Sequence, residues 1–351
     1  MRKRPTLADV ALAAGVSKTT ASLALNGNNR IPPATRERVL AAAETLQFRP
    51  HAVARALVRR RAEVLGIVCA VQPFAKMAPH AFEHALLSAI FYHALERGYN
   101  PQIYGFPDQD AGIEEFLRYS DGRSDAFLLI NPPNRSALVE YLQSVGIPAI
   151  TVLSRDSGPH ARWVDSDNEG GIYAAIAHLA GLGHRHIAYL TGRSDEPIVL
   201  ARVAAFRKAL QAHGLPVRED WIQPYTWNAD ATAAQLDQWL AADTPPTALL
   251  TWYDFAAEDV YQAARERGLR IPEDLSVVGF DDAPSARTML PSLTTVRQDP
   301  DCLGKAAVEF ALETLCAVPD AKMPSGVICP VELIIRQSTA PPVSFGSNLA
   351  V

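Results

Sequence analysis

The strongest constraint on the fold is the pattern of residues 6–57, in which short helical segments are separated by turn signals. Apolar residues recur at helical spacing from Leu7 to Leu25. Gly15 interrupts them where a tight turn needs a residue that tolerates positive φ. The pattern predicts a helix-turn-helix, followed by a third helix and a basic segment. An ordinary packed helical hairpin has the same pattern and remains an alternative at this point.

Capping residues support the same helix boundaries. Thr6 can cap the first helix with Asp9 three residues later, and Ser17 directly precedes the second helix. In a helix-turn-helix, the N-terminal half of the second helix meets base edges in the major groove. The residues expected to face the bases are Lys18, Thr19, Ser22 and Leu23. Thr20 and Asn26 suit contacts with phosphates instead.

The charge distribution favours a nucleic-acid partner for this head. Residues 1–61 hold twelve Lys or Arg against three acidic residues, a net charge of +9. Residues 62–351 hold 21 basic and 35 acidic side chains, a net charge of −14. A basic head attracts a phosphate backbone, whereas an acidic body is repelled by it. A membrane-seeking face is disfavoured because no amphipathic apolar face accompanies the basic residues.

The head resembles the DNA-binding domain of the lac repressor/galactose repressor (LacI/GalR) family of bacterial regulators. The resemblance rests on TLADVALAAGVSKTTASLALNG at residues 6–27, TRERV at 35–39 and AVARAL at 52–57. It implies that Thr6, Ser17 and Arg55 join the DNA contacts and that residues 50–59 form a hinge that folds on operator DNA. It also implies that Leu57 is an apolar wedge in the minor groove, where lost stacking is exchanged for a bent duplex. A core leucine is the alternative for Leu57.

Four positions of the head depart from the family pattern. Ala21 stands where Val is usual, Leu23 where Arg is usual, His51 where Asn is common, and Pro32 where a capping Ser is common. Because leucine cannot donate a hydrogen bond to guanine, we expect Leu23 to make an apolar contact with the base pair that it faces, or no contact. The departures concern the operator sequence and leave the binding mode intact.

The remaining 290 residues are long enough for a two-lobed body with a sizeable core. With 48% hydrophobic and 20% charged residues, the composition is that of a globular protein, and no apolar run approaches the roughly 20 residues that span a membrane. The N-terminus has no apolar segment after its charges, so a secretory signal is not expected. Cys69, Cys302, Cys316 and Cys329 lie far apart, which predicts buried thiols in a reducing cytoplasm.

Short apolar runs alternate with helical stretches along the body, which predicts two parallel sheets covered on both faces. The expected strands are 64–71, 102–106, 125–130, 149–153, 187–191, 221–225, 248–252, 275–280 and 331–335. The expected helices are 81–97, 136–145, 170–182, 199–213, 231–241, 255–267 and 302–315. The fold class is thus an all-α helix-turn-helix head plus a doubly wound α/β body.

The body resembles the effector domain of the same family, which is built like periplasmic binding proteins, with two lobes joined by three crossings. The matching motifs are VDSDN at residues 164–168, LGHRHIA at 182–188, SVVGFDD at 276–282 and LTTVRQ at 293–298, with Arg202 and Phe206. The resemblance implies a head at 1–49, a hinge at 50–61, an effector-binding and dimerisation domain at 62–340 and a tail at 341–351. The N-subdomain is expected at about 62–162 and 291–325, and the C-subdomain at about 163–290 and 326–340.

The resemblance also implies an effector site in which Arg202 and Asp281 hold sugar hydroxyls. Ligands of open parallel sheets gather at the carboxyl ends of strands, and Asp281 directly follows an expected strand. An exposed ion pair is the alternative for either residue. Five further ligand contacts are expected: Phe74, Trp252, Tyr253, Arg155 and Gln298. The three aromatic residues could stack on a sugar ring, although aromatic residues after strands more often belong to the core. Tyr253 stands where the family commonly has Asn, so its hydrogen bonds to the ligand must differ.

Catalysis is not expected. His184 and His186 belong to a turn that the family carries without catalysis, so a structural role is predicted for them. The sequence contains no G-x-S-x-G, GxxxxGK[ST] or HExxH motif, and no cofactor or metal is expected.

The sequence therefore predicts a cytoplasmic, nucleoid-associated transcriptional repressor. We expect a homodimer on a palindromic operator, controlled allosterically by a small effector, with a sugar preferred. The tail has no leucine heptad, which argues against tetramerisation through a coiled coil. Two alternatives remain open: the same architecture with a purine-like corepressor, and a sugar-converting enzyme with a DNA-binding head.

Overall fold

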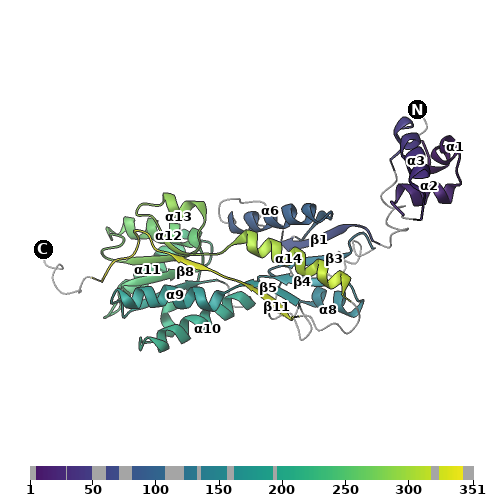
Figure 1. The fold of residues 1–351 in the computed structure, drawn as a ribbon. Helices are drawn as coiled ribbons and strands as arrows, with labels where there is room; N and C mark the ends of the chain where they lie inside the picture. Colours follow the sequence, from purple (N-terminus) through teal and green to yellow (C-terminus); the bar gives the residue numbers. More distant parts are fainter. Residues whose placement is uncertain are drawn as a thin grey trace. The chain divides into compact units, whose positions relative to one another are not determined.

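The computed structural model describes residues 5–28, 30–49, 61–70, 81–106, 122–132, 136–155, 162–192, 196–317 and 324–342. The chain divides into two compact units, Met1–Val64 with Gly122–Asp125, and Leu65–Asp121 with Ala126–Val351. Figure 1 shows the small helical unit and the larger α/β unit. Each is described by itself below.

The described residues of the small unit form the three predicted helices. They are α1 (Leu7–Ala14), α2 (Lys18–Leu25) and α3 (Pro33–Thr45). Gly15 ends α1 in the left-handed conformation, with φ 64°. The helices enclose a small core of mostly alanine and valine side chains, formed by Val10, Ala11, Ala14, Ala21, Ala24, Val39 and Ala43. Small side chains let the three short helices approach closely, so this unit is held together by few apolar atoms.

The large unit contains two six-stranded sheets (Figure 1), which confirms the predicted α/β class. The first sheet has the order β11-β5-β4-β3-β1-β2 and the second the order β12-β10-β9-β8-β6-β7. The pairings β11–β5, β5–β4, β4–β3, β3–β1, β10–β9, β9–β8, β8–β6 and β6–β7 are parallel, whereas β10 and β12 pair in antiparallel fashion. The parallel pairings agree with the strand-helix alternation of the sequence.

The first lobe holds the first sheet. Its elements are β1 (Val64–Ala70), α6 (Ala81–Glu96), β2 (Asn100–Phe106), β3 (Ala126–Ile130), α8 (Ala137–Ser144), β4 (Ala149–Val152), β5 (Arg162–Ser166), α14 (Pro300–Cys316) and β11 (Gly326–Cys329). The side chains of β3 alternate between two clusters: Leu128 joins the core that includes α6 and α14, whereas Phe127 and Leu129 join the core that includes α8. Helices therefore cover both faces, and every residue of β3 is buried.

The second lobe holds the second sheet. Its elements are α9 (Asn168–Gly181), β6 (Ile187–Thr191), α10 (Pro197–Ala212), η2 (Glu219–Trp221), β7 (Ile222–Pro224), α11 (Ala229–Leu240), β8 (Ala248–Thr251), α12 (Asp254–Glu266), β9 (Ser276–Asp281), α13 (Pro284–Thr288), β10 (Thr294–Arg297) and β12 (Glu332–Ile334). On β8, Leu250 packs in the core that contains α9 and α10 residues, and Leu249 in the core that contains α11 and α12 residues. Figure 1 shows α9 beside α10.

Three chain crossings join the lobes. The chain passes from β5 to α9, from β10 to α14 and from β11 to β12. Because β5 and β11 pair in the first sheet and β10 in the second, the crossings follow Ser166, Arg297 and Cys329. The subdomain boundaries expected at 162/163, 290/291 and 325/326 therefore move by four to seven residues.

No helix in the described ranges is both long and apolar enough to cross a membrane.

Candidate functional site

The caps of α1 and α2 form as predicted. Thr6 and Asp9 make a capping box in which the Thr6 backbone N–H donates to Asp9 Oδ2 at 2.8 Å. Ser17 Oγ accepts a 3.0 Å hydrogen bond from the backbone N–H of Thr20. These bonds satisfy helix N–H groups that would otherwise lack partners, and they fix where the second helix begins.

The residues expected to face DNA lie on the side of α2 away from its buried Ala21 and Ala24. Lys18 and Thr19 are exposed, and Ser22 and Leu23 are half-buried. These four side chains are therefore available on one surface of the helix.

The two residues expected to contact phosphates also make bonds within the head. The hydroxyl of Thr20 lies 2.8 Å from Ser17 Oγ, and Asn26 Nδ2 donates to the backbone oxygen of Ser22 at 2.9 Å. Each of these two side chains thus makes one hydrogen bond within the helix-turn-helix and helps to stabilise α2. Arg55 and Leu57, which the resemblance assigns to the hinge, lie outside the described residues, as does Phe74.

Most of the effector-site residues expected from the sequence lie at the carboxyl ends of strands in the second sheet. Asp281 is the last residue of β9, Trp252 and Tyr253 follow β8, and Gln298 follows β10. Arg202 joins them from the middle of α10. Strands of one parallel sheet end at the same edge, which brings together residues up to about a hundred positions apart.

Arg202 is buried, with 2% of its surface exposed. Its Nε donates to Asn168 Oδ1 at 2.6 Å and its Nη1 donates to the backbone oxygen of Trp252 at 3.0 Å. The guanidinium carbon lies 4.5 Å from the centre of the Trp252 ring system. Burial lowers the pKa of Arg202. Neutral acceptors and ring faces contact its guanidinium directly, and the charges of Asp281 and Asp165 also favour its charged form.

A chain of polar contacts connects Arg202 to the first lobe across the β5–α9 crossing. Asn168 accepts from Arg202 and donates through Nδ2 to Asp165 Oδ1 at 3.0 Å. Asp165 in turn accepts from Arg155 Nε at 2.7 Å, and Arg155 Nη2 donates to the backbone oxygen of Ser166 at 2.7 Å. Two nitrogens of Arg155 are thus engaged at the crossing, which gives this residue a positioning role there.

Asp281 is held in an unusual state. Gln298 Nε2 donates to Asp281 Oδ1 at 2.7 Å, and the backbone at Asp281 has φ 109°. Burial, followed by the nearby charge of Asp254, raises the pKa of Asp281 well above its usual range, although Arg202 opposes the shift. The other side-chain atom of Gln298, Oε1, is buried without a hydrogen-bond partner. A half-buried carboxyl group beside an amide with an open acceptor is suited to bind a polar ligand.

Tyr253 belongs to a cluster of aromatic rings with Tyr225, Trp227 and Phe255. The Tyr253 ring centre lies 5.7 Å from that of Tyr225, 5.3 Å from that of Trp227 and 6.3 Å from that of Phe255. Trp227 is 50% exposed, whereas Tyr253 is buried and its hydroxyl has no hydrogen-bond partner. The cluster combines ring faces with one unpaired buried hydroxyl, the combination that binds a flat or ring-shaped polar molecule.

Sequence reasoning missed Asn168, Trp227 and Phe255. Trp227 follows a strand in the same way as Trp252 does, so an aromatic residue after an apolar run was the available signal. Asn168 lies in the VDSDN motif, but its role depends on an arginine 34 residues away, so the motif alone did not mark it as a site residue.

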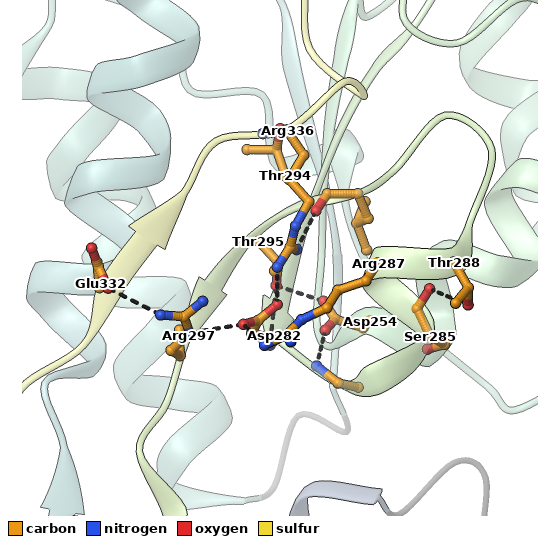
Figure 2. A network of polar contacts seen from close by, with 12 residues as sticks. Asp254, Asp282, Ser285, Arg287, Thr288, Thr294, Thr295, Arg297, Glu332 and Arg336 are labelled. Carbon is orange, nitrogen blue, oxygen red and sulfur yellow. Dashed lines mark hydrogen bonds and ion pairs between the residues drawn. The ribbon is translucent and has the colours of Figure 1, made fainter.

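Asp282 points into a different network from Asp281, shown in Figure 2. Its carboxylate accepts from Arg297 Nε at 2.7 Å and from Arg336, and Arg287 lies 3.4 Å away. Burial raises the pKa of Asp282, but the hydrogen bonds from Arg336 and Arg297 outweigh this and the net shift is downward. Arg297 also reaches Glu332 on β12 at 3.3 Å. This ionised carboxylate ties β9, β10 and the segment after β12 together.

Asp254 makes structural contacts in the same region of Figure 2. Its Oδ1 accepts from Thr295 Oγ1 and its Oδ2 accepts from the backbone N–H of Ala283, both at 2.6 Å. Burial raises the pKa of Asp254 to about 7. The charge of Asp254 also raises the pKa of Asp281.

The histidine turn is structural, as predicted for His184. His184 Nδ1 lies 2.8 Å from Thr247 Oγ1, and its Nε2 lies 2.9 Å from the backbone oxygen of Ala340. Burial lowers the pKa of His184. His186 packs edge-on against Trp221. Within the described ranges, no group of three His, Cys, Asp or Glu residues is arranged to hold a metal ion.

The cysteines correct one prediction. All four were expected to be buried thiols, but only Cys69 and Cys329 are; Cys302 is half-buried and Cys316 is exposed. Cys316 is the last residue of α14, where the helix leaves the core.

Comparison with known proteins gives matches over both parts of the chain. Residues 6–51 match the profile of the bacterial regulatory proteins of the lacI family, and residues 176–339 match that of a periplasmic binding protein-like domain. Catabolite control protein A of Priestia megaterium is 30% identical over 345 residues, which cover 95% of this chain and 99% of that protein. The HTH-type transcriptional repressor PurR of Actinobacillus pleuropneumoniae serotype 3 (strain JL03) is 29% identical over 335 residues, which cover 95% and 98%.

Two solved structures show the same architecture. The lac repressor dimer bound to operator and the anti-inducer ONPF superposes with a TM-score of 0.82 at 27% identity, covering 96% of this chain and all of that chain. The complex of the transcriptional regulator CelR with cellobiose gives a TM-score of 0.70 at 26% identity, covering 95% and 100%.

Proposed function

The chain belongs to the lacI family of bacterial regulatory proteins, and we propose that it is an operator-binding transcriptional repressor whose DNA affinity is set by a small effector. It acts as a homodimer on a palindromic operator in the cytoplasm, associated with the nucleoid. The observation that carries the proposal is the presence in one chain of a capped helix-turn-helix and of a buried Arg202 that interacts electrostatically with Asp281. Relatives of this architecture are regulators, and no enzymatic activity is proposed.

The DNA interface is assigned to α2. Lys18, Thr19, Ser22 and Leu23 face the bases, while Thr6, Ser17, Thr20 and Asn26 support phosphate contacts. Arg55 and Leu57 are assigned to the hinge by the family resemblance. The basic charge of the first 61 residues supplies the sequence-independent part of the affinity.

The effector is assigned to the carboxyl ends of the strands in the second sheet. Arg202, Asp281 and Gln298 provide the polar contacts, with Trp252 and Tyr253 as ring contacts. Phe74 is assigned to the effector site from the family resemblance alone. Arg155 is assigned a positioning role at the β5–α9 crossing. A sugar fits this set because it offers hydroxyls to the polar groups and a C–H face to the rings. The charge of Glu83 on α6 also raises the pKa of Asp281, so the first lobe faces the same site.

Control arises from differential binding. An effector that contacts both lobes stabilises one arrangement of the three crossings over another, and the hinges of the dimer transmit the difference to DNA. The polar chain from Arg202 to Arg155 is the direct connection across the first crossing.

A purine-like effector is the second candidate, because the Trp227–Tyr253–Phe255 rings would suit a planar heterocycle as well as a sugar face. The two candidates are separated by experiment. Operator DNA is selected from a random pool with the full chain, and thermal shifts are then measured against sugars, sugar phosphates and nucleobases. A sugar that raises the melting temperature and changes operator affinity supports the first candidate; a nucleobase that does so supports the second.

The absence of any selected DNA sequence would overturn the proposal of an operator-binding repressor. Leu57→Ala provides a finer test of the hinge: we expect specific binding to fall far more than nonspecific binding. Equal losses in both would remove Leu57 from the wedge role.

A further inference from the structure

Two cysteine thiols meet where the lobes join. Cys302 Sγ and Cys329 Sγ are 2.9 Å apart, although 27 residues separate them in the sequence. That distance exceeds the length of a disulfide bond by only about 0.9 Å. Cys302 is the third residue of α14, and Cys329 is the last residue of β11.

All three crossings come together at this pair. Cys329 directly precedes the β11–β12 crossing, and its backbone oxygen accepts a 2.9 Å hydrogen bond from the N–H of Asp167, in the β5–α9 crossing. The backbone N–H of Cys302 donates to Asp299 Oδ1 at 3.0 Å, and Asp299 lies in the β10–α14 crossing. A covalent bond between the thiols would therefore link the β10–α14 crossing to the β11–β12 crossing. The bond would lie next to the β5–α9 crossing.

The two thiols differ in accessibility. Cys329 is 1% exposed, whereas Cys302 is half-buried and lies in the first turn of α14. Burial, and then the contact with Cys302, raises the pKa of the Cys329 thiol. An oxidant from solution therefore reaches Cys302 first, and Cys329 is placed to react second.

We propose that Cys302 and Cys329 form a reversible redox site that a hydroperoxide converts to a disulfide. With hydrogen peroxide, the Cys302 sulfur attacks one peroxide oxygen, the O–O bond breaks, and the departing hydroxide takes up the proton of the Cys302 thiol as water, leaving a sulfenic acid on Cys302. Cys329 sulfur then attacks the Cys302 sulfur. The S–S bond forms, the S–O bond breaks, and hydroxide leaves with the Cys329 proton as a second water. Two thiols are oxidised and one hydroperoxide is reduced.

This site adds an input that does not depend on the effector. Transient disulfides in a reducing compartment serve as sensors, and this one would restrain the segments that must shift when the lobes move. The bond would join the first turn of α14 to the end of β11, the edge strand of the first sheet.

The test needs neither operator nor effector. The full chain is reduced, freed of reductant and treated with a small excess of hydrogen peroxide, and its thiols are titrated after unfolding. We expect the four thiols of the chain to fall to two. Peptide mass mapping without reductant should give a linked pair containing Cys302 and Cys329, lighter by two hydrogens, which dithiothreitol separates. The melting temperature of the oxidised protein should rise by roughly 5 °C.

Matched variants identify the pair. The double variant Cys69→Ser/Cys316→Ser keeps the proposed site and should fall from two thiols to none, whereas Cys302→Ser and Cys329→Ser should each form no intramolecular disulfide. The proposal is overturned if the double variant keeps both thiols, if Cys302 proceeds to sulfinic acid without a linked peptide, or if the link involves Cys69 or Cys316.

Discussion

The guanidinium carbon of Arg202 lies 3.5 Å from the centre of the Phe280 ring. This contact places a residue of α10 against β9, whose last residue is Asp281. One short segment of β9 therefore determines the position of both charged groups assigned to the effector. The ring replaces part of the hydration that a buried guanidinium loses, which lets the charge remain inside the lobe.

We expect Arg202→Lys to remove the effector response while operator affinity stays within a few-fold of wild type. Lysine keeps the charge but cannot donate in a plane to both Asn168 and the Trp252 backbone oxygen. Thermal shift with the effector found by screening measures the loss. An undiminished shift would remove Arg202 from the site.

Tyr253→Phe should separate stability from binding. The Tyr253 hydroxyl is buried without a partner, so its removal should raise the free energy of unfolding by about 1 kcal/mol. The effector should bind at least tenfold more weakly, because the same hydroxyl is the one available to it. Tyr225→Phe is the matched control: its hydroxyl donates to Asp259 Oδ2 at 2.7 Å, and we expect a stability loss of about 1 kcal/mol. Equal effects of the two changes on stability would contradict this assignment.

The stability difference between the wild type and Asp254→Asn should depend on pH. The pKa of Asp254 is about 7 in the folded chain and near 4 when unfolded. Between these values the folded protein keeps a proton that the unfolded chain loses, so its stability falls as pH rises through this window. Below pH 4 and above pH 7 this contribution is constant.

Unfolding by urea at pH 5 and pH 8 measures the effect. We expect the wild type to lose about 2 kcal/mol relative to Asp254→Asn over this range. Taking the difference cancels other titrating groups such as His184, whose lowered pKa acts with the opposite sign. A difference that does not change with pH would show that Asp254 is ionised in the folded protein throughout.

Gly304→Ala should destabilise the first lobe by about 2 kcal/mol, even though alanine favours helices. An added Cβ would lie 2.7 Å from Ala89 Cβ and 2.9 Å from the backbone nitrogen of Ile90, so α14 and α6 would have to separate. Gly181→Ala, at the last residue of α9, has no atom within 4 Å of the added Cβ and should gain up to about 1 kcal/mol. Denaturant midpoints compare the two, and a neutral Gly304→Ala would mean that the helices are less tightly packed.

Leu23→Arg should change the base preference of the head toward guanine at one operator position, because arginine donates to the O6 and N7 atoms of that base. Selection from a random DNA pool, before and after the change, measures it. Leu12→Arg is the charge control: Leu12 is 83% exposed on α1, so the same charge should raise affinity for all sequences alike. A new preference in both variants, or in neither, would count against readout by residue 23.

Sequence reasoning predicted the buried strands well and the crossings poorly. β3 and β9 are apolar runs between turn signals, and their helices have clear periodicity. β5, β10 and β11 were not predicted as strands. β5 ends in Asp165 and Ser166, and β11 is a four-residue edge strand, so neither has an apolar pattern of its own. Their pairing depends on residues more than a hundred positions away.

The same distinction holds for the site. Asp281 and Trp252 follow strands and could be predicted from that position alone. The contact of Asn168 with Arg202 and the Cys302–Cys329 pair could not be predicted locally, because each depends on a partner that the fold brings near. Local patterns predict elements, whereas contacts between distant segments require the three-dimensional arrangement.

The paths of β11 and β12 carry a consequence for synthesis of the chain. These two strands, from residues 326–334, are edge strands of the first and the second sheet, and they follow every other strand in the sequence. A chain emerging from the ribosome can form the head early, but both lobes lack one strand until this short segment appears. The nascent protein would therefore expose two unpaired sheet edges until β11 and β12 pair with them. The ability to sense an effector would then arise late in synthesis and in a single step.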